Sequence, residues 1–137
     1  MALAIILTLE RDVPAAPRPP ANATGKAVAR EADKLDFLAR SADVAQPSSM
    51  LSEPRAALVA QLVADGFDPA KMRLPPERFF PASDGLRTLA ALIAHVSAKP
   101  NDVKQPVAIL RELRAFEATL TAAAAAGVAF HFTKADV

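Results

Sequence analysis

The sequence predicts one α+β domain, in which about four helices pack on a small sheet formed by an N-terminal and a C-terminal strand. Short apolar segments of strand character lie near both ends of the 137-residue chain, and apolar residues between them recur at helical spacing. A composition of 52% hydrophobic and 23% charged residues is typical of a globular protein of this length. We therefore interpret residues 1–137 as a single domain.

The first strand is expected over residues 3–9, where both alternating faces are largely apolar. A proline-rich surface loop follows over residues 13–23, because proline fixes φ and has no backbone donor. Two strands alone are marginal in water. They should therefore pair with each other beneath the helices, or with strands of a second copy. The apolar Ile6 on the second face favours a homo-oligomer.

Apolar spacing predicts four helices, over residues 24–42, 52–66, 84–98 and 105–126. Ser52 is expected to cap the second helix, and Gly66 to end it in a left-handed conformation. The second helix is expected to bury one face, made of Leu58, Val59, Leu62 and Val63.

The closing strand is expected over residues 128–133, after Gly127 ends the fourth helix. Phe130 and Phe132 fall on one face of this strand and His131 on the other. We expect it to be the neighbour of the first strand.

Composition argues against several classes of function. Sixteen basic and fifteen acidic residues leave a net charge of +1, whereas nucleic-acid binders usually carry a basic excess, so no nucleic-acid partner is predicted. No cysteine is present, which excludes thiolate chemistry. No apolar run approaches the roughly 18 residues of a membrane span. No positive charge precedes the apolar start, so a cytoplasmic protein is expected. The richness in Ala, Arg, Asp and Pro indicates a GC-rich bacterial genome.

No sequence motif for catalysis, a metal or a cofactor stands out. The four glycines form no phosphate-binding pattern, no G-x-S-x-G surrounds a serine, and neither histidine has ligand-spaced partners. We therefore predict no cofactor and no metal site, and we favour a non-enzymatic protein.

Two features remain as candidate sites. Phe79 and Phe80 lie in an irregular segment beside Arg87, and aromatic and guanidinium groups are typical interface anchors. His131 lies on the last strand, where a pocket with a carboxylate such as Glu117 would suit acid–base or ligand chemistry. The candidate partner-binding residues are therefore Phe79, Phe80, Arg87 and His131.

Short motifs across most of the chain from Gly25 onward resemble a family of small uncharacterised bacterial proteins of about this length. These motifs are Gly25-Lys26-Ala27, Leu35-Asp36, Leu38-Ala39, Leu51-Ser52, Leu74-Pro75, Phe79-Phe80-Pro81, Gly85-Leu86 with Leu89, Gly127-Val128 and Phe130-His131. They are mainly helix caps and packing positions, and the resemblance implies no activity.

Two functional hypotheses follow. The first is a non-enzymatic interaction protein, for example an immunity-type partner, that uses the surface formed by Phe79, Phe80 and Arg87. The second is a small enzyme or ligand-binding domain with a pocket near His131.

Overall fold

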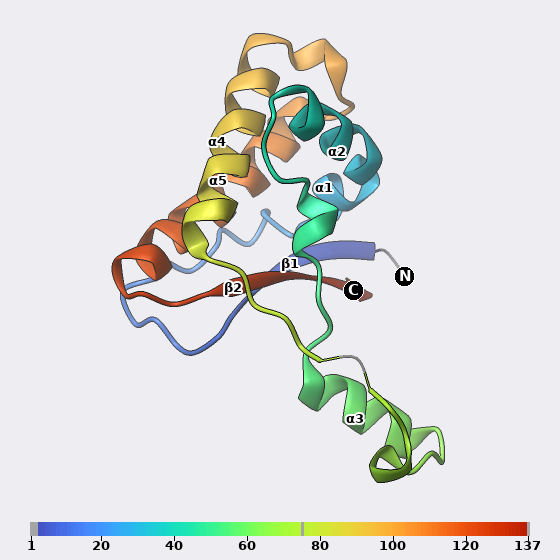
Figure 1. The fold of residues 1–137 in the computed structure, drawn as a ribbon. Helices are drawn as coiled ribbons and strands as arrows, with labels where there is room; N and C mark the ends of the chain where they lie inside the picture. Colours follow the sequence, from blue (N-terminus) through green and yellow to red (C-terminus); the bar gives the residue numbers. More distant parts are fainter. Residues whose placement is uncertain (1–2, 75, 137) are drawn as a thin grey trace.

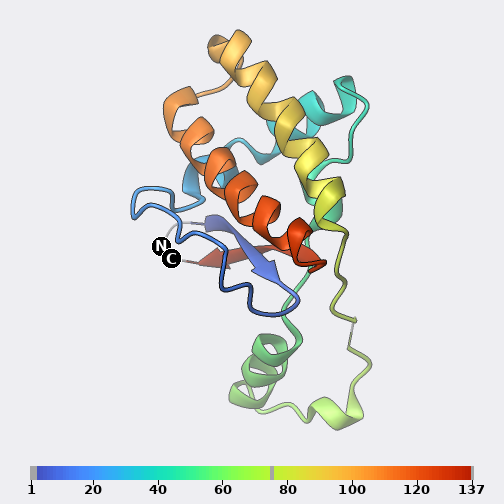
Figure 2. The same ribbon diagram turned by 90° about the vertical axis from the view of Figure 1, so that its left-hand side faces the viewer.

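The computed structural model describes residues 3–74 and 76–136 and has the α+β architecture that the sequence predicts (Figure 1). The described elements, in chain order, are β1 (Leu3–Leu9), α1 (Lys26–Arg30), α2 (Ala32–Ser41), η1 (Pro47–Met50), α3 (Arg55–Ala64), η2 (Pro69–Lys71), α4 (Ala82–Ala98), η3 (Pro100–Asp102), α5 (Pro106–Ala125) and β2 (Phe130–Asp136). The elements labelled η are short 3₁₀ helices. Four of the α-helices lie on one side of the sheet, and α3 projects away from it (Figures 1 and 2).

The two strands pair with each other, as predicted. They are antiparallel, in a register that runs from Leu3 opposite Asp136 to Leu9 opposite Phe130. This pairing brings the two ends of the described chain together (Figure 1). The second strand begins two residues later than predicted, because the Val128 N–H still donates to the Ala123 carbonyl oxygen at the end of α5 (2.9 Å).

The other edge of β2 is paired as well. The N–H groups of Phe80 and Phe130 donate to each other's carbonyl oxygens, at 2.7 and 2.9 Å, and the Ser52 N–H donates to the Phe132 carbonyl oxygen at 2.9 Å. These contacts come from the two segments that flank α3 in the sequence. β2 is therefore the central strand, and the chain leaves it and returns to it on either side of α3.

The first predicted helix is divided in two. Glu31 has φ −106° and ψ 21°, which ends α1 and begins α2. The apolar stripe that predicts this helix consists of Val28, Ala32, Leu35, Ala39 and Ala42. The structure buries Val28, Leu35 and Ala39, whereas Ala42 follows α2 and is exposed. The buried Glu112 of α5 accepts the N–H groups of Ala27 (3.3 Å) and Val28 (2.9 Å). Its carboxylate thus satisfies donors in the first turn of α1 that have no partner within the helix.

α4 and α5 lie side by side and cover the sheet (Figures 1 and 2). Their contact with β2 is close at Gly85, where an added Cβ would lie 2.5 Å from Phe130 Cζ and 2.7 Å from Leu120 Cδ1. The core beneath them contains the fully buried Phe130, Leu113 and Leu120. Gly85 therefore sets the distance between α4 and the sheet.

The second predicted helix differs most from expectation, because its apolar face is not buried. α3 forms over Arg55–Ala64 but has no buried residue, and Val63 is 59% exposed. The predicted buried face of Leu58, Val59, Leu62 and Val63 is therefore wrong. The predicted capping role of Ser52 is also wrong. Pro54 directly precedes the helix, and Ser52 Oγ instead accepts the Arg78 N–H at 2.9 Å.

We refer to residues 53–78 as the arm. None of its described residues, 53–74 and 76–78, is buried. α3 ends as predicted at Gly66, which has φ +86°, and the Phe67 N–H donates to the Leu62 carbonyl oxygen at 2.9 Å. The arm extends from the body on the side of the sheet opposite the four core helices (Figure 1).

Gly25 offers a test of how closely the chain must approach β1. It has φ +85°, its carbonyl oxygen accepts the Ile5 N–H at 3.0 Å, and an added Cβ would overlap the carbonyl oxygen of Ile5. Gly25→Ala should therefore cost about 3 kcal/mol of unfolding free energy, the sum of left-handed strain and overpacking. Chemical denaturation followed by circular dichroism measures it.

The control is Gly127→Ala, since Gly127 has φ +68° but no atom near an added Cβ. It should lose only the conformational term, about 1–2 kcal/mol. Equal losses in the two variants would contradict the close approach at Gly25.

Candidate functional site

The structure brings together two of the four residues that the sequence singles out. The rings of Phe79 and His131 have centroids 5.0 Å apart, and the His131 side chain is completely buried. Phe80 is held by its backbone pairing with Phe130, and the Arg78 guanidinium lies 5.8 Å from its ring centroid. Arg87 is exposed on α4, and no described hydrogen bond or ring contact joins it to Phe79 or Phe80. The partner-binding role of these four residues stays a prediction.

His131 lies beside a carboxylate, but that carboxylate is Glu77 and not Glu117. The distance from His131 Nε2 to Glu77 Oε2 is 2.7 Å. On the other side of the ring, Nδ1 lies 3.1 Å from Thr133 Oγ1, which lies 3.0 Å from Thr8 Oγ1. This row of side chains occupies the face of the sheet that is turned away from the core helices.

The electrostatics of this network involve mainly Glu77. Its hydrogen bond with His131 lowers the pKa of the Glu77 carboxyl below the usual 4.5, against the opposing effect of desolvation. The Arg55 N–H donates to the other carboxylate oxygen of Glu77, Oε1, at 3.2 Å. Glu77 thus joins the start of α3 to a buried side chain of the central strand.

A hydroxyl, an imidazole and a carboxylate in a row are also the groups of a nucleophilic relay. Here the imidazole has no exposed surface, and Thr133 is buried with it. A substrate therefore has no access to these groups in this conformation. These side chains instead attach the base of the arm, where residues 53–78 meet the sheet, together with the Ser52–Arg78 hydrogen bond.

The arm itself leaves three large apolar side chains exposed to solvent. Val63, Phe67 and Met72 are 59%, 55% and 41% exposed. Its carboxylates are largely occupied, since Asp65 accepts from the Gln61 amide and Asp68 from the Ala70 N–H. Among the described residues, no carboxylate lies within 4.0 Å of the charged nitrogens of its basic residues, which are Arg55, Lys71, Arg73 and Arg78.

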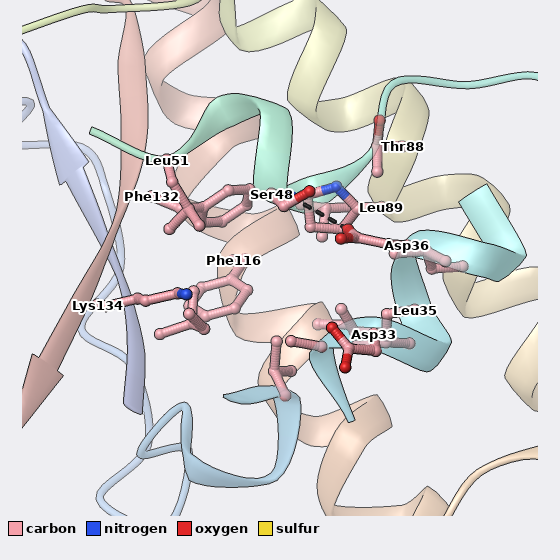
Figure 3. Close-up of a pocket in the computed structure, with 16 residues that line it drawn as sticks. Asp33, Leu35, Asp36, Ser48, Leu51, Thr88, Leu89, Phe116, Phe132 and Lys134 are labelled. Carbon is pink, nitrogen blue, oxygen red and sulfur yellow. Dashed lines mark hydrogen bonds between the residues drawn. The ribbon is translucent and has the colours of Figure 1, made fainter. Parts of the chain in front are cut away.

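A separate cavity of about 80 Å³ lies on the opposite face of the sheet, among α2, η1, α4 and α5 (Figure 3). Buried apolar side chains line its depth, including Leu89, Leu92 and Leu113. Exposed polar side chains border its mouth, namely Asp33, Ser48 and Lys134. β2 contributes to the lining, because Phe132 and Lys134 point to the face opposite His131.

The remaining histidine pairs at the surface. His95 Nε2 lies 2.7 Å from Asp102 Oδ2, and this hydrogen bond lowers the pKa of the Asp102 carboxyl. Within residues 3–74 and 76–136, no three His, Cys, Asp or Glu side chains are placed to hold a metal ion. In that same part of the chain, no helix has the length and apolar character to cross a membrane.

No family model, curated protein or solved structure matches the chain. The resemblance noted from the short motifs therefore stays a prediction, and the function has to be argued from geometry.

Three features of the structure were not predicted from the sequence. Glu77 lies 54 positions from His131, directly after a proline pair, and nothing in its local sequence indicates a buried partner. The residues that line the cavity come from seven elements, and in the sequence most of these residues have the pattern of ordinary core positions. The exposed face of α3 also carries no sequence signal, since its pattern is that of an ordinary amphipathic helix.

We predict that Glu77→Gln loosens the base of the arm. Replacing the carboxylate should speed amide exchange at Ser52 and Phe80 about tenfold at neutral pH, because a charged hydrogen bond contributes about 1.5 kcal/mol. In the wild type, the Glu77 carboxylate stabilises the attachment of the arm to β2 at pH values above the usual pKa of 4.5. That contribution is lost as the pH falls below 4.5 and through the lowered pKa that Glu77 has in the folded state. The variant should lack this acid transition, measured by hydrogen exchange against pH.

The control for this prediction is Glu53→Gln, which removes an exposed carboxylate at the other end of the arm. It should exchange like the wild type and keep the acid transition. Equal behaviour of the two variants would show that Glu77 does not hold the arm.

Proposed function

We propose that the protein is a non-enzymatic interaction module of the bacterial cytoplasm that docks on a partner protein through its arm. An immunity-type protein is one case of such a module. The observation that carries the proposal is α3, a helix without a single buried residue that nevertheless has an apolar face. Exposed apolar clusters of this kind are typical of protein-binding surfaces.

Exposed apolar side chains on the arm lack the free energy that burial would contribute. Burying a Val, Met or Phe side chain is worth roughly 1.5–3 kcal/mol, and the fold leaves Val63, Phe67 and Met72 without this gain. A partner that covers them recovers it. An amphipathic helix that lays its apolar face into a groove is a common mode of recognition, and α3 already has the helical conformation. Little ordering entropy then opposes docking.

Charge does not select the partner. The arm carries four basic and four acidic residues, and a carboxylate that accepts a hydrogen bond keeps its charge, so the arm has no net charge. The exposed apolar side chains therefore decide what the arm binds. We propose a partner with an apolar groove.

The surface predicted from the sequence has a different part in this proposal. Phe79 and His131 lie at the base of the arm, where they fix its direction, and Phe80 is paired to β2. Arg87 is exposed outside that base, so a substitution at Arg87 tests the surface that the sequence predicts. The competing partner is a second copy of this chain, since Leu3 and Ile6 on β1 are also exposed apolar residues.

The test places a photo-reactive amino acid at position 63 in the native host, with position 107 as the matched site. Val107 is a valine that is 70% exposed on α5, outside the arm. Crosslinking to a second protein from position 63 alone is the expected result. Crosslinks to this chain alone would mean that a second copy covers the arm. That result, or equal crosslinking from both sites, would contradict the proposal.

Affinity for the purified partner then measures the contribution of the arm. Val63→Asp should weaken binding by about 30-fold or more, because a buried apolar anchor contributes about 2 kcal/mol and an unpaired carboxylate is costly to bury in an apolar groove. Val107→Asp and Arg87→Glu should change it less than about twofold. A loss with Arg87→Glu but not with Val63→Asp would place the interface on the surface predicted from the sequence instead.

A ligand-binding domain is the second candidate function, and one observation favours it at a different place from the pocket expected near His131. The His131 side chain is fully buried, but a cavity lined by Phe132 and Lys134 lies on the opposite face of the same strand. We propose this cavity as the ligand site.

A further inference from the structure

We propose that the cavity beneath α2 binds a free α-amino acid with a branched apolar side chain, of which leucine is the type. The inference rests on the ligand-binding candidate and is independent of the arm. The cavity has an apolar interior, and side chains of opposite charge lie on opposite walls of its mouth (Figure 3).

The depth of the cavity selects an apolar group. Leu89, Leu92 and Leu113 are at most 2% exposed and line it together with Phe116 and Phe132. The Thr88 hydroxyl, which also borders it, already donates to the Ala45 carbonyl oxygen at 2.7 Å. No buried side-chain nitrogen or oxygen of the described residues lacks a hydrogen-bond partner. A polar group placed deep in the cavity would therefore find no free partner and would be disfavoured.

The size of the cavity limits that group. Its volume of about 80 Å³ is several times the ~10–15 Å³ that one water needs. It suits a group the size of an isobutyl side chain better than a long acyl chain or an indole. Dry apolar cavities in proteins do bind small hydrocarbons of comparable shape.

The mouth of the cavity carries charges of both signs on opposite walls. Lys134 extends from β2 over Phe116, and Asp33 and Asp36 face it from α2 (Figure 3). Asp36 Oδ1 accepts the Ser48 N–H at 3.1 Å, whereas no described hydrogen bond engages Asp33. Within the described chain, no carboxylate oxygen lies within 4.0 Å of Lys134 Nζ.

These two charges are therefore held apart by the fold, across the opening of an apolar cavity. A ligand that carries an ammonium and a carboxylate on one carbon matches this arrangement, with its ammonium toward Asp33 and its carboxylate toward Lys134. A simple fatty acid would use only the lysine, and an alkylamine only the aspartate. The zwitterion is the one class that uses both sides of the mouth and the interior at once.

The experiment compares three ligands that share one apolar group. These are L-leucine, 4-methylpentanoate, which lacks the ammonium, and 3-methylbutylamine, which lacks the carboxylate. Binding is followed by NMR titration of the full chain, because the protein has no Trp or Tyr to report by fluorescence. Leucine should bind with a dissociation constant of about 0.1–1 mM, and each analogue about five- to tenfold more weakly. The shifts should fall at Leu92, Phe116 and Lys134 and not in the arm.

Two surface variants assign the charges. Lys134→Met should weaken leucine and 4-methylpentanoate about five- to tenfold but leave 3-methylbutylamine unchanged. Asp33→Asn should weaken leucine and the amine but leave the acid unchanged. Both positions are exposed, so neither variant is expected to impair folding. Lys99→Met, an exposed lysine after α4, is the matched control and should change nothing.

Each contrary outcome refutes a different part of the proposal. Equal binding of all three ligands, unaffected by Lys134→Met and Asp33→Asn, would leave a ligand cavity but refute the amino-acid class. Absence of shifts with all three ligands at 10 mM, a concentration about tenfold above the weakest dissociation constant expected for leucine, would refute the ligand site itself. Neither result bears on docking through the arm, which is measured separately at Val63.

Discussion

The pairing of β2 along both of its edges is the constraint on which the rest of the structure depends. β1 pairs with it from Leu9 to Leu3, and Ser52 and Phe80 pair with its other edge. A sheet with only two regular strands would be marginal alone. The additional pairing on the second edge gives β2 the environment of a central strand, buried from Phe130 to Thr133. One face of this strand then serves the core and the cavity, and the other holds His131.

The same pairing allows the arm to exist without a core of its own. Both ends of the arm are fixed on one strand, at positions that pair with Phe130 and Phe132. Closing a long loop between two nearby anchors costs little additional entropy as its length grows. Glu77 reinforces this closure, because it accepts from Arg55 and contacts His131. The apolar face of α3 thus stays attached to the sheet at both ends while remaining at least partly exposed to solvent, as the proposed docking role requires.

Two buried polar side chains connect distant parts of the fold. Glu112 accepts two N–H groups from the first turn of α1, 84 and 85 positions away. His131 connects β2 to Glu77, and through it to α3. Each is fully partnered, and a satisfied buried polar group strongly favours one arrangement over its alternatives, because breaking its bonds leaves an unpaired group in the interior.

The sequence by itself determined the α+β class, the strand at each end of the chain and the ends of α3 and α5 at Gly66 and Gly127. These features depend on local chemistry: alternation of apolar residues, and a left-handed turn that glycine adopts easily. Only the tertiary structure decided that α3 stands away from the core. An amphipathic pattern states that a helix has an apolar face but not what covers it. The Glu77–His131 contact, the carboxylate of Glu112 at α1 and the cavity each join residues far apart in the chain. Their partners are set by packing, and no local pattern records them.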